Sequence, residues 1–242
     1  MLNLDMSVFN FKEFVIDQEN CPMKINTDGV LLGALAEVKS PKNILDIGTG
    51  TGVIALMLAQ RNKLANIDAV DIDGNAFEKA DMNFKNSLFN ERLNAFLCDF
   101  KFFFEQNPSK KYDLIVSNPP YYLHALQSPK AHKNISKHTD AQFFLDLLLV
   151  AKNHLTIGGS IELIVPLDVS IMLQNIASDY HLFLKRIIEI RSFQNTAVIR
   201  HLISLNNVKT EEIISDDFCI YADKGIHSLA YKAALKNFFT IF

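Results

Sequence analysis

Short apolar segments alternate with longer amphipathic segments along the middle of the chain. Segments that are apolar throughout are typical of buried strands, and the longer ones are typical of helices that cover a sheet. Strands are expected at 43–47, 66–71, 94–98, 112–117 and 160–165, and helices at 52–60, 75–87, 141–154 and 169–178. Repeated βα units of this kind predict a parallel sheet with helices on both faces.

The pattern changes after Pro166, where the helix at 169–178 is followed by two strand-like segments, 185–192 and 198–205, with no full helix between them. Consecutive strands joined by a short loop pair antiparallel. The sequence therefore predicts a doubly wound α/β fold with a mostly parallel seven-stranded sheet and an antiparallel final strand. We expect one domain over 1–242, with an N-terminal segment at 1–42, a core at 43–205 and a C-terminal extension at 206–242.

A glycine-rich loop joins the first predicted strand to the first helix of the core. Gly48, Gly50 and Gly52 let the backbone turn sharply and approach a ligand with no Cβ in the way. Their spacing differs from the dinucleotide fingerprint, and Asp46 at the strand end would repel a pyrophosphate. A carboxylate there suits a cationic ligand such as S-adenosylmethionine, which carries an ammonium and a sulfonium group. The alternative interpretation is a tight turn that binds nothing.

Acidic residues end the next two predicted strands. Asp71 follows the second strand and can accept hydrogen bonds from both ribose hydroxyls of a nucleoside cofactor. Asp73 is expected to cap the next helix. Asp99 follows the third strand, where it could accept a hydrogen bond from the adenine amine of the cofactor. Each of these acids could alternatively be a solvent-exposed residue at a strand end.

The fourth predicted strand ends in Asn118-Pro119-Pro120-Tyr121. Two prolines stop the strand and make its tip rigid. If the side-chain oxygen of Asn118 and the carbonyl of Pro119 each accept an N–H from an adenine N6 amine, they orient its lone pair and stabilise the developing positive charge. Tyr121 offers an aromatic face on which a flipped base can stack. The alternative is a simple Pro-Pro turn.

The composition bears on the cellular compartment and on the partners that the protein can bind. The chain has 242 residues, of which 49% are hydrophobic and 21% charged, and no apolar stretch is long enough to span a membrane. No basic start followed by an apolar run suggests a secretory signal, and three scattered cysteines predict reduced, buried thiols and no metal site. We therefore expect a cytosolic protein. A net charge of −3 argues mildly against a nucleic-acid partner, unless positive charge is concentrated locally.

With these motifs in place, the chain resembles bacterial tRNA adenine-N6 methyltransferases, which act on the adenosine beside the anticodon of a valine tRNA. The resemblance extends to both flanks: it includes Phe9, Phe11, Lys12, Phe14 and Gln18, the segment from Met23 to Gly33, and the segment from Ile226 to Phe239 with Tyr231 and Leu235. It implies a Rossmann-like class I methyltransferase fold and methylation at position 37 of the tRNA. It also implies that Lys24, Thr27 and Gly29 lie over the cofactor.

An acid-free stretch follows the strand tip and is the expected RNA surface. Residues 114–139 contain no Asp or Glu but include Lys130, Lys133 and Lys137, so an RNA backbone could lie along them. A second basic patch is possible at Lys185, Arg186, Arg191 and Arg200. The run Phe102-Phe103-Phe104 is expected in the core rather than in base stacking.

Three other functions stay open at this point. A protein glutamine-amide methyltransferase also uses Asn-Pro-Pro-Tyr, but such enzymes carry a substantial helical domain before the catalytic one, and only 42 residues precede the first predicted strand here. A DNA adenine methyltransferase needs a target-recognition domain, for which the region after Val165 is short. A non-catalytic RNA-binding protein with a vestigial fold would not need Asn118, Asp71 and the glycines.

Overall fold

The computed structural model describes residues 7–38, 40–119 and 133–242, with the backbone alone for 133–140. Within these residues the strands are β1 (Val8–Asn10), β2 (Val15–Asp17), β3 (Asn43–Ile47), β4 (Asn66–Asp71), β5 (Leu93–Leu97), β6 (Tyr112–Ser117), β7 (Leu155–Val165), β8 (Phe183–Phe193), β9 (Val198–Asn206), β10 (Ile214–Asp223) and β11 (Ile226–His227). The helices are α1 (Thr27–Leu35), α2 (Val53–Arg61), α3 (Gly74–Lys85), α4 (Phe100–Gln106), α5 (Lys133–His154), α6 (Leu167–Ile176) and α7 (Leu229–Leu235), with 3-10 turns η1 (Asn90–Arg92) and η3 (Ala177–Tyr180).

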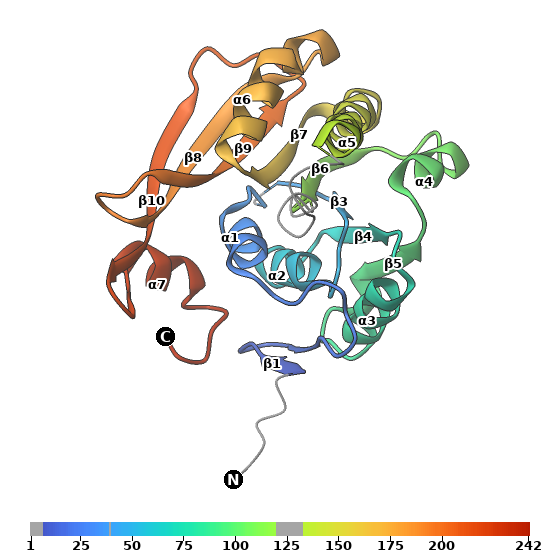
Figure 1. The fold of residues 1–242 in the computed structure, drawn as a ribbon. Helices are drawn as coiled ribbons and strands as arrows, with labels where there is room; N and C mark the ends of the chain where they lie inside the picture. The colour runs from blue at the N-terminus through green and yellow to red at the C-terminus, as the bar shows by residue number, and fades with distance from the viewer. Residues whose placement is uncertain (1–6, 39, 120–132) are drawn as a thin grey trace.

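Most strands form one sheet in the order β11-β10-β8-β9-β7-β6-β3-β4-β5 (Figure 1). The strands from β8 to β5 are the seven predicted ones, and β9 is antiparallel to both of its neighbours while the other six are parallel. The predicted doubly wound fold is therefore confirmed. The order reverses at β3, whose two neighbours are β4 and β6, and ligands of such sheets bind at this kind of switch point.

The C-terminal extension contains two strands beyond the predicted seven. β10 pairs parallel with β8 and continues the sheet, and β11 pairs antiparallel with the end of β10. The residues of β10 before Phe218, which include Asp216 and Asp217, are exposed. Charged residues on an edge strand discourage pairing with other chains. Because these acidic residues interrupt the apolar pattern, the sequence did not predict β10.

Helices cover both faces of the sheet, and each face has its own apolar cluster (Figure 1). Helices α1, α2, α3 and α7 contribute to one cluster, and α4, α5 and α6 to the other. Neighbouring residues of a strand point to opposite faces, so Ile44 belongs to the first cluster and Leu45 to the second. The expectation for the phenylalanine run is confirmed for Phe103 and Phe104, which are buried, but Phe102 is half exposed.

The connection between α5 and β7 differs from the prediction. The helix begins at Lys133, eight residues before the expected start at Ala141, and the strand begins directly after His154 rather than at Ser160. The glycine pair lies within the strand, where its pairing with β6 shifts register. A Cβ on Gly159 would lie 2.9 Å from the carbonyl oxygen of Thr156 and 3.1 Å from those of Tyr112 and Asp113, so this irregularity requires glycine.

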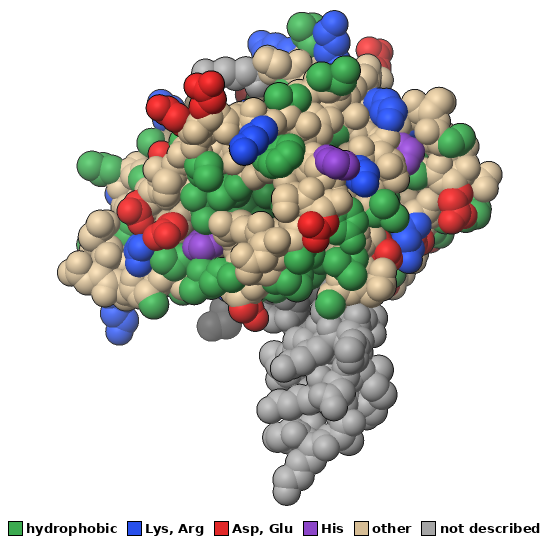
Figure 2. Space-filling view, turned by 90° about the horizontal axis from the view of Figure 1, so that it is seen from above, with side chains coloured by type: hydrophobic (Ala, Val, Ile, Leu, Met, Phe, Trp, Pro, Cys, Tyr) green, Lys and Arg blue, Asp and Glu red, His purple; other side chains and the backbone are tan. Residues whose placement is uncertain are grey.

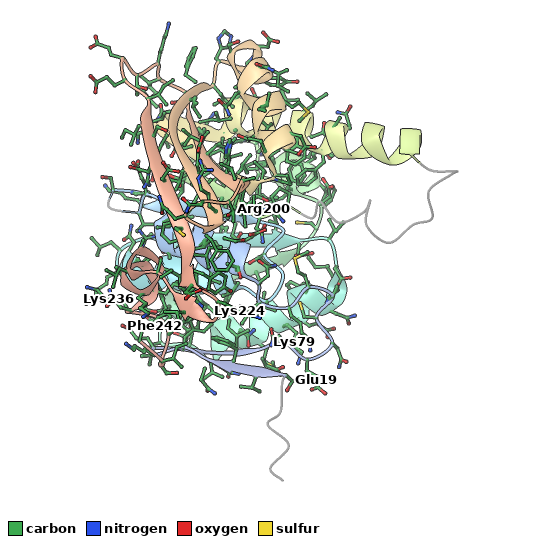
Figure 3. All side chains as sticks on the ribbon, turned by 60° about the vertical axis from the view of Figure 1, so that its left-hand side comes forward. Glu19, Lys79, Arg200, Lys224, Lys236 and Phe242 are labelled. Atoms are coloured by element: carbon green, nitrogen blue, oxygen red, sulfur yellow. The ribbon has the colours of Figure 1, made fainter. Side chains whose placement is uncertain are left out.

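The N-terminal hairpin lies against the last residues of the chain. β1 and β2 form an antiparallel hairpin, and the backbone N–H of Lys12 donates to the Phe238 carbonyl at 2.8 Å. Lys79 of α3, which is labelled in Figure 3, forms an ion pair with Asp17 at 2.7 Å that fixes the end of the hairpin. The hairpin leads directly into the segment before α1, so these contacts hold that segment against the core.

No helix in the described ranges is long and apolar enough to cross a membrane.

Candidate active site

The tips of four neighbouring strands surround one cavity of about 320 Å³ at the carboxyl edge of the sheet. Gly48 follows β3, Asp71 ends β4, Cys98 follows β5 and Asn118 follows β6, and all four residues line the cavity. The strand tips are in register, because Ile47 lies beside both Val70 and Ser117. The cavity therefore lies at the switch point of the sheet, and its size is within the range of small-molecule sites.

The glycines of the loop have different roles. Gly48 and Gly50 line the cavity with positive φ angles of 72° and 57°, and a Cβ on either would meet no atom within 4 Å. Their backbone is therefore open to a ligand. Gly52 is not among the lining residues and precedes α2 with φ 81°; a Cβ there would lie 2.5 Å from Cε1 of Phe84. Gly52 therefore allows α3 to pack closely against the loop.

Asp46 lies fully buried beneath the loop and is not among the residues that line the cavity. Its Oδ2 accepts a hydrogen bond from Thr49 Oγ1 at 2.7 Å, whereas its buried Oδ1 has no hydrogen-bond partner among the described residues. Burial raises the pKa of Asp46 to about 7; the Thr49 hydrogen bond opposes this rise, and the charge of Asp71 adds to it. A cation above the loop would favour the ionised form.

Asp71 organises the rim of the cavity that it lines. Its Oδ2 accepts the Gly50 N–H at 2.8 Å, and its Oδ1 accepts the Asp73 N–H at 3.0 Å. A carboxylate oxygen has two lone pairs, so both oxygens can still accept a ligand hydroxyl. Asp73 caps α3 by accepting the Ala76 N–H at 2.9 Å, as the sequence predicted.

Asp99 also lines the cavity and caps α4, with Oδ1 accepting the Lys101 N–H at 2.7 Å. The sequence did not predict α4, so this capping role is an addition to the expected one. Phe100 and Phe143 form an apolar wall beside it, with ring centroids 5.5 Å apart in an edge-to-face arrangement. The cysteines are all free, but only Cys21 is buried; Cys98 lies partly exposed on the cavity wall.

The segment before α1 forms the opposite side of the cavity. Lys24 and Gly29 line it, whereas Thr27, the first residue of α1, is not among the lining residues. Asn26 caps the helix, its Oδ1 accepting the Gly29 N–H at 2.8 Å. The first turn of α1 is also tied to β9, because Arg200 Nε donates to Asp28 Oδ2 at 2.8 Å.

Asn118 lies at the point where this segment meets the tip of β6. Its Nδ2 donates to Asn26 Oδ1 at 3.3 Å. The neighbouring Ser117 Oγ donates to the Ile47 carbonyl at 2.7 Å, which links the tip of β6 to that of β3. Pro119 is buried and is not among the lining residues, and Tyr121 lies outside the described residues.

The residues present fit a cationic nucleoside cofactor. The cavity is lined by open glycine backbone and by the carboxylates of Asp71 and Asp99, and a buried carboxylate with an unpartnered oxygen lies beneath the glycine loop. Among the described residues, no group of three His, Cys, Asp or Glu side chains is placed to hold a metal ion.

The chain matches the model of the methyltransferase small domain over residues 26–169. It belongs to that family. Among its relatives, the tRNA1(Val) (adenine(37)-N6)-methyltransferase of Pedobacter heparinus is 43% identical over 236 residues, covering 98% of this chain and 99% of that protein. The protein of the same name from Flavobacterium johnsoniae is 36% identical, covering 96% of this chain and 99% of that protein. The resemblance inferred from the motifs is confirmed.

Solved structures show the same fold at low sequence identity. A predicted O-methyltransferase of Agrobacterium tumefaciens superposes with a TM-score of 0.65 at 18% identity, covering 87% of this chain and 95% of that chain. A methyltransferase of Pyrococcus furiosus gives 0.58 at 21%, covering 80% and 90%. The fold of this chain is therefore shared with proteins of distant sequence.

The basic residues expected to contact RNA fall into two sets. Lys130 lies outside the described residues, and Lys133 and Lys137 lie in the part of α5 described by its backbone alone. The second set consists of paired residues: Lys185 with Glu37, Arg186 with Asp216, Arg191 with Glu189 and Asp217, and Arg200, which is labelled in Figure 3, with Asp28. The face shown in Figure 2 likewise carries basic and acidic side chains interspersed around hydrophobic areas. The second set therefore does not form a surface of uncompensated positive charge.

Sequence reasoning missed Asn26 and the apolar wall of the methyltransferase cavity. Asn26 precedes Thr-Asp-Gly and an apolar run, which is the signature of a helix N-cap and could have revealed it. Its contact with Asn118, 92 residues away, leaves no local signal. Phe143 was expected only as part of an apolar helix, and nothing in its spacing indicates the cavity.

Proposed function

We propose that this methyltransferase transfers a methyl group from S-adenosylmethionine to the N6 amine of an adenosine in tRNA, at position 37 beside the anticodon. The observation that carries the proposal is that Asn118, the first residue of Asn-Pro-Pro-Tyr, lines the same cavity as the glycine loop. Methyl donor and acceptor amine can therefore meet in one enclosed space.

The cofactor would lie against the backbone of Gly48 and Gly50, with its ribose hydroxyls on Asp71 and its adenine near Asp99. Lys24 and Gly29 would cover it from the opposite side. Asp46, Gly52 and Thr27 would act indirectly, since they are not among the residues that line the cavity. When bound, the cofactor supplies a methyl group already activated on a sulfonium.

The protein then has to orient a weak nucleophile. The lone pair of an adenine amine is delocalised into the ring, and acceptors for its two N–H groups turn that lone pair toward the donor. The Asn118 oxygen, which lines the cavity, would be the first of those acceptors, and the carbonyl of the adjacent Pro119, which is not among the lining residues, would be the second. Both would stabilise the positive charge that develops on nitrogen. The extra proton leaves after the N–C bond has formed. Tyr121 would stack on the flipped base.

The relatives favour this function over the other interpretations. Proteins named for adenine-37 methylation of a valine tRNA match this chain over nearly their whole length. That match supports adenosine over a protein glutamine as acceptor, and catalysis over a vestigial fold. A tRNA substrate would place the protein in the cytosol, with Lys130, Lys133 and Lys137 on the RNA backbone.

The test is to incubate the protein with tRNA and labelled S-adenosylmethionine and to identify the modified nucleoside by mass spectrometry. N6-methyladenosine is expected. Asn118→Ala should leave cofactor binding within a few-fold and lower the single-turnover rate by about 10²–10³. Asn118→Asp keeps an acceptor of the same shape and should retain more activity. The proposal fails if Asn118→Ala reacts at the normal rate, or if the methyl group is found on guanosine or protein.

A further inference from the structure

Asn118 can serve as an acceptor only if its amide has the correct orientation. An amide has a donor end and an acceptor end, and rotation by 180° exchanges them. With Nδ2 toward the substrate, Asn118 would repel the N–H groups that it is proposed to accept. Something in the site must therefore fix which end of the amide points away from Asn26 and toward the cavity.

The structure contains such a constraint in the cap of α1. The Gly29 N–H points at the side chain of Asn26 at 2.8 Å, and only an oxygen can accept it. This helix cap identifies the atom there as Oδ1. The same oxygen lies 3.3 Å from the amide of Asn118. Since Asn26 presents an acceptor, the group of Asn118 that faces it has to be the NH₂ group.

The cap is held in a fixed position relative to the strand tip. The ion pair between Asp28 and Arg200 joins the first turn of α1 to β9, with both side chains about four-fifths buried. Gly29 lies close to the amide as well: a Cβ on this residue would be 3.6 Å from Asn118 Nδ2 and 3.5 Å from Asn26 Oδ1. The helix start cannot move away without breaking these contacts.

We propose that Asn26 is a positioning residue for Asn118: the cap of α1 fixes the Asn26 oxygen, and that oxygen selects the orientation of the Asn118 amide in which the NH₂ group faces Asn26 and the amide oxygen accepts from the acceptor amine. This inference rests on the proposed role of Asn118. It also explains why the segment that covers the cofactor cavity is joined to the catalytic tip, since ordering of one orients the other.

Two substitutions separate capping from positioning. Asn26→Ser keeps a good capping acceptor but is too short to reach Asn118, whereas Asn26→Asp can accept from both N–H groups. Because Asn26 itself lines the cavity, the rate is measured at saturating cofactor. Under that condition Asn26→Ser should lower the single-turnover rate roughly tenfold, the factor that one net hydrogen bond supplies. Asn26→Asp should stay within a few-fold of the wild-type rate. An unchanged rate in Asn26→Ser overturns the inference.

A double-mutant cycle shows whether Asn26 acts through Asn118. In an Asn118→Ala background, Asn26→Ser should cause no further loss, because there is no amide left to orient. If the two losses multiply, Asn26 acts independently and the inference is wrong. If Asn118→Ala alone reacts at the normal rate, the proposed function itself fails. A slow Asn118→Ala with a normal Asn26→Ser overturns only the positioning role.

Ser228 provides a matched control, because it caps α7 by accepting the Tyr231 N–H at 3.0 Å and is not among the residues that line the cavity. Ser228→Ala should lower the melting temperature and leave the methylation rate unchanged. If Ser228→Ala slows methylation as much as Asn26→Ser does, the loss of a helix cap explains both effects and the positioning role is rejected.

Discussion

At the scale of single residues, the ionisation of buried Asp46 is expected to depend on a ligand that binds above the loop without touching Asp46. Its desolvation raises its pKa to about 7, above its ordinary value of 3.8. A group with a raised folded-state pKa stabilises the fold below its unfolded pKa, and that contribution is lost as the pH rises toward the folded value. Between about pH 4 and 7, the ligand-free protein therefore loses stability because of Asp46. A cationic ligand above the loop would compensate the charge.

We predict that the affinity for S-adenosylmethionine increases as the pH rises through about 7. Ionised Asp46 attracts the sulfonium and ammonium groups, and the neutral form does not. Calorimetry between pH 6 and 8 measures this effect, and Asp46→Asn should abolish the dependence. S-adenosylhomocysteine, which lacks the sulfonium charge, should show a weaker one.

Glu162 provides the control for this prediction. Burial also raises its pKa to about 7, but it lies on β7, where its Oε1 accepts the Glu37 N–H, and it is not among the cavity-lining residues. Glu162→Gln should alter the pH dependence of unfolding and leave that of cofactor binding intact. The role of Asp46 would be contradicted if Glu162→Gln and Asp46→Asn flattened the binding profile equally.

Asp71 differs from its neighbour Asp73 although both are strand-end acids. If Asp71 binds the ribose as proposed, Asp71→Ala removes one or two charge-assisted hydrogen bonds, each worth about 1.5–3 kcal/mol, and should weaken cofactor binding at least tenfold. Asp73→Ala removes a helix cap and should mainly lower stability, by about 1 kcal/mol. Calorimetry and urea unfolding of the two variants separate these effects. Equal affinities in wild type and Asp71→Ala would remove Asp71 from the cofactor site.

At the scale of elements, the strand–loop–helix unit contains two kinds of glycine. Gly50→Ala meets only the backbone cost of a positive φ, roughly 1–2 kcal/mol, since a Cβ there has nothing within 4 Å. Gly52→Ala adds an overlap with Phe84 at 2.5 Å. We predict that Gly52→Ala lowers the free energy of unfolding more than Gly50→Ala does, as measured in urea.

The reason for the difference can be tested directly. Phe84→Leu removes the ring atoms that a Cβ on Gly52 would meet, so it should reduce the additional cost of Gly52→Ala while leaving the cost of Gly50→Ala unchanged. Gly50→Ala, whose backbone lines the cavity, should weaken cofactor binding more than its stability loss suggests. Equal costs for both alanines in the wild-type background would show that Phe84 moves aside freely.

The elements that the sequence predicted best are those decided by burial alone. β3, β4 and β6 have the predicted bounds, because most of their residues are buried and their ends carry glycine, aspartate or proline signals. β10 and α4 were missed for opposite reasons. The first is an exposed edge strand with acidic residues, and the second is a short helix whose three consecutive phenylalanines hide its periodicity.

The residues of the candidate site can likewise be separated into those that the sequence could predict and those that it could not. The glycine loop, Asp71 and Asn118 could be predicted because each lies at the end of a recognisable strand, and parallel strands bring such ends together. Asn26 and the wall formed by Phe100 and Phe143 could not, because their roles depend on contacts between distant segments. The fold places chemistry at its strand ends, but tertiary contacts decide how that chemistry is oriented.

At the scale of the whole molecule, RNA binding has to be reconciled with a net charge of −3. Phosphate contacts release counterions only where positive charge is not already neutralised by the protein. Lys185, Arg186 and Arg191 lie beside acidic partners, so each would have to exchange one ion pair for another. The stretch 114–139, which contains the proposed catalytic residue Asn118, has no acid of its own and is the stronger candidate.

We predict that tRNA binding depends on salt chiefly through Lys130, Lys133 and Lys137. If each neutralises one phosphate, together they contribute a slope of roughly −2 to −3 in a plot of log affinity against log salt concentration. Replacing all three with alanine should flatten the measured slope by that amount. The control replaces the paired residues Lys185, Arg186 and Arg191 with alanine, which should change the slope by less than one contact. If the control flattens the slope and the first triple variant does not, the RNA lies along β8, and its phosphates must displace Glu37, Asp216 and Glu189 from their present partners.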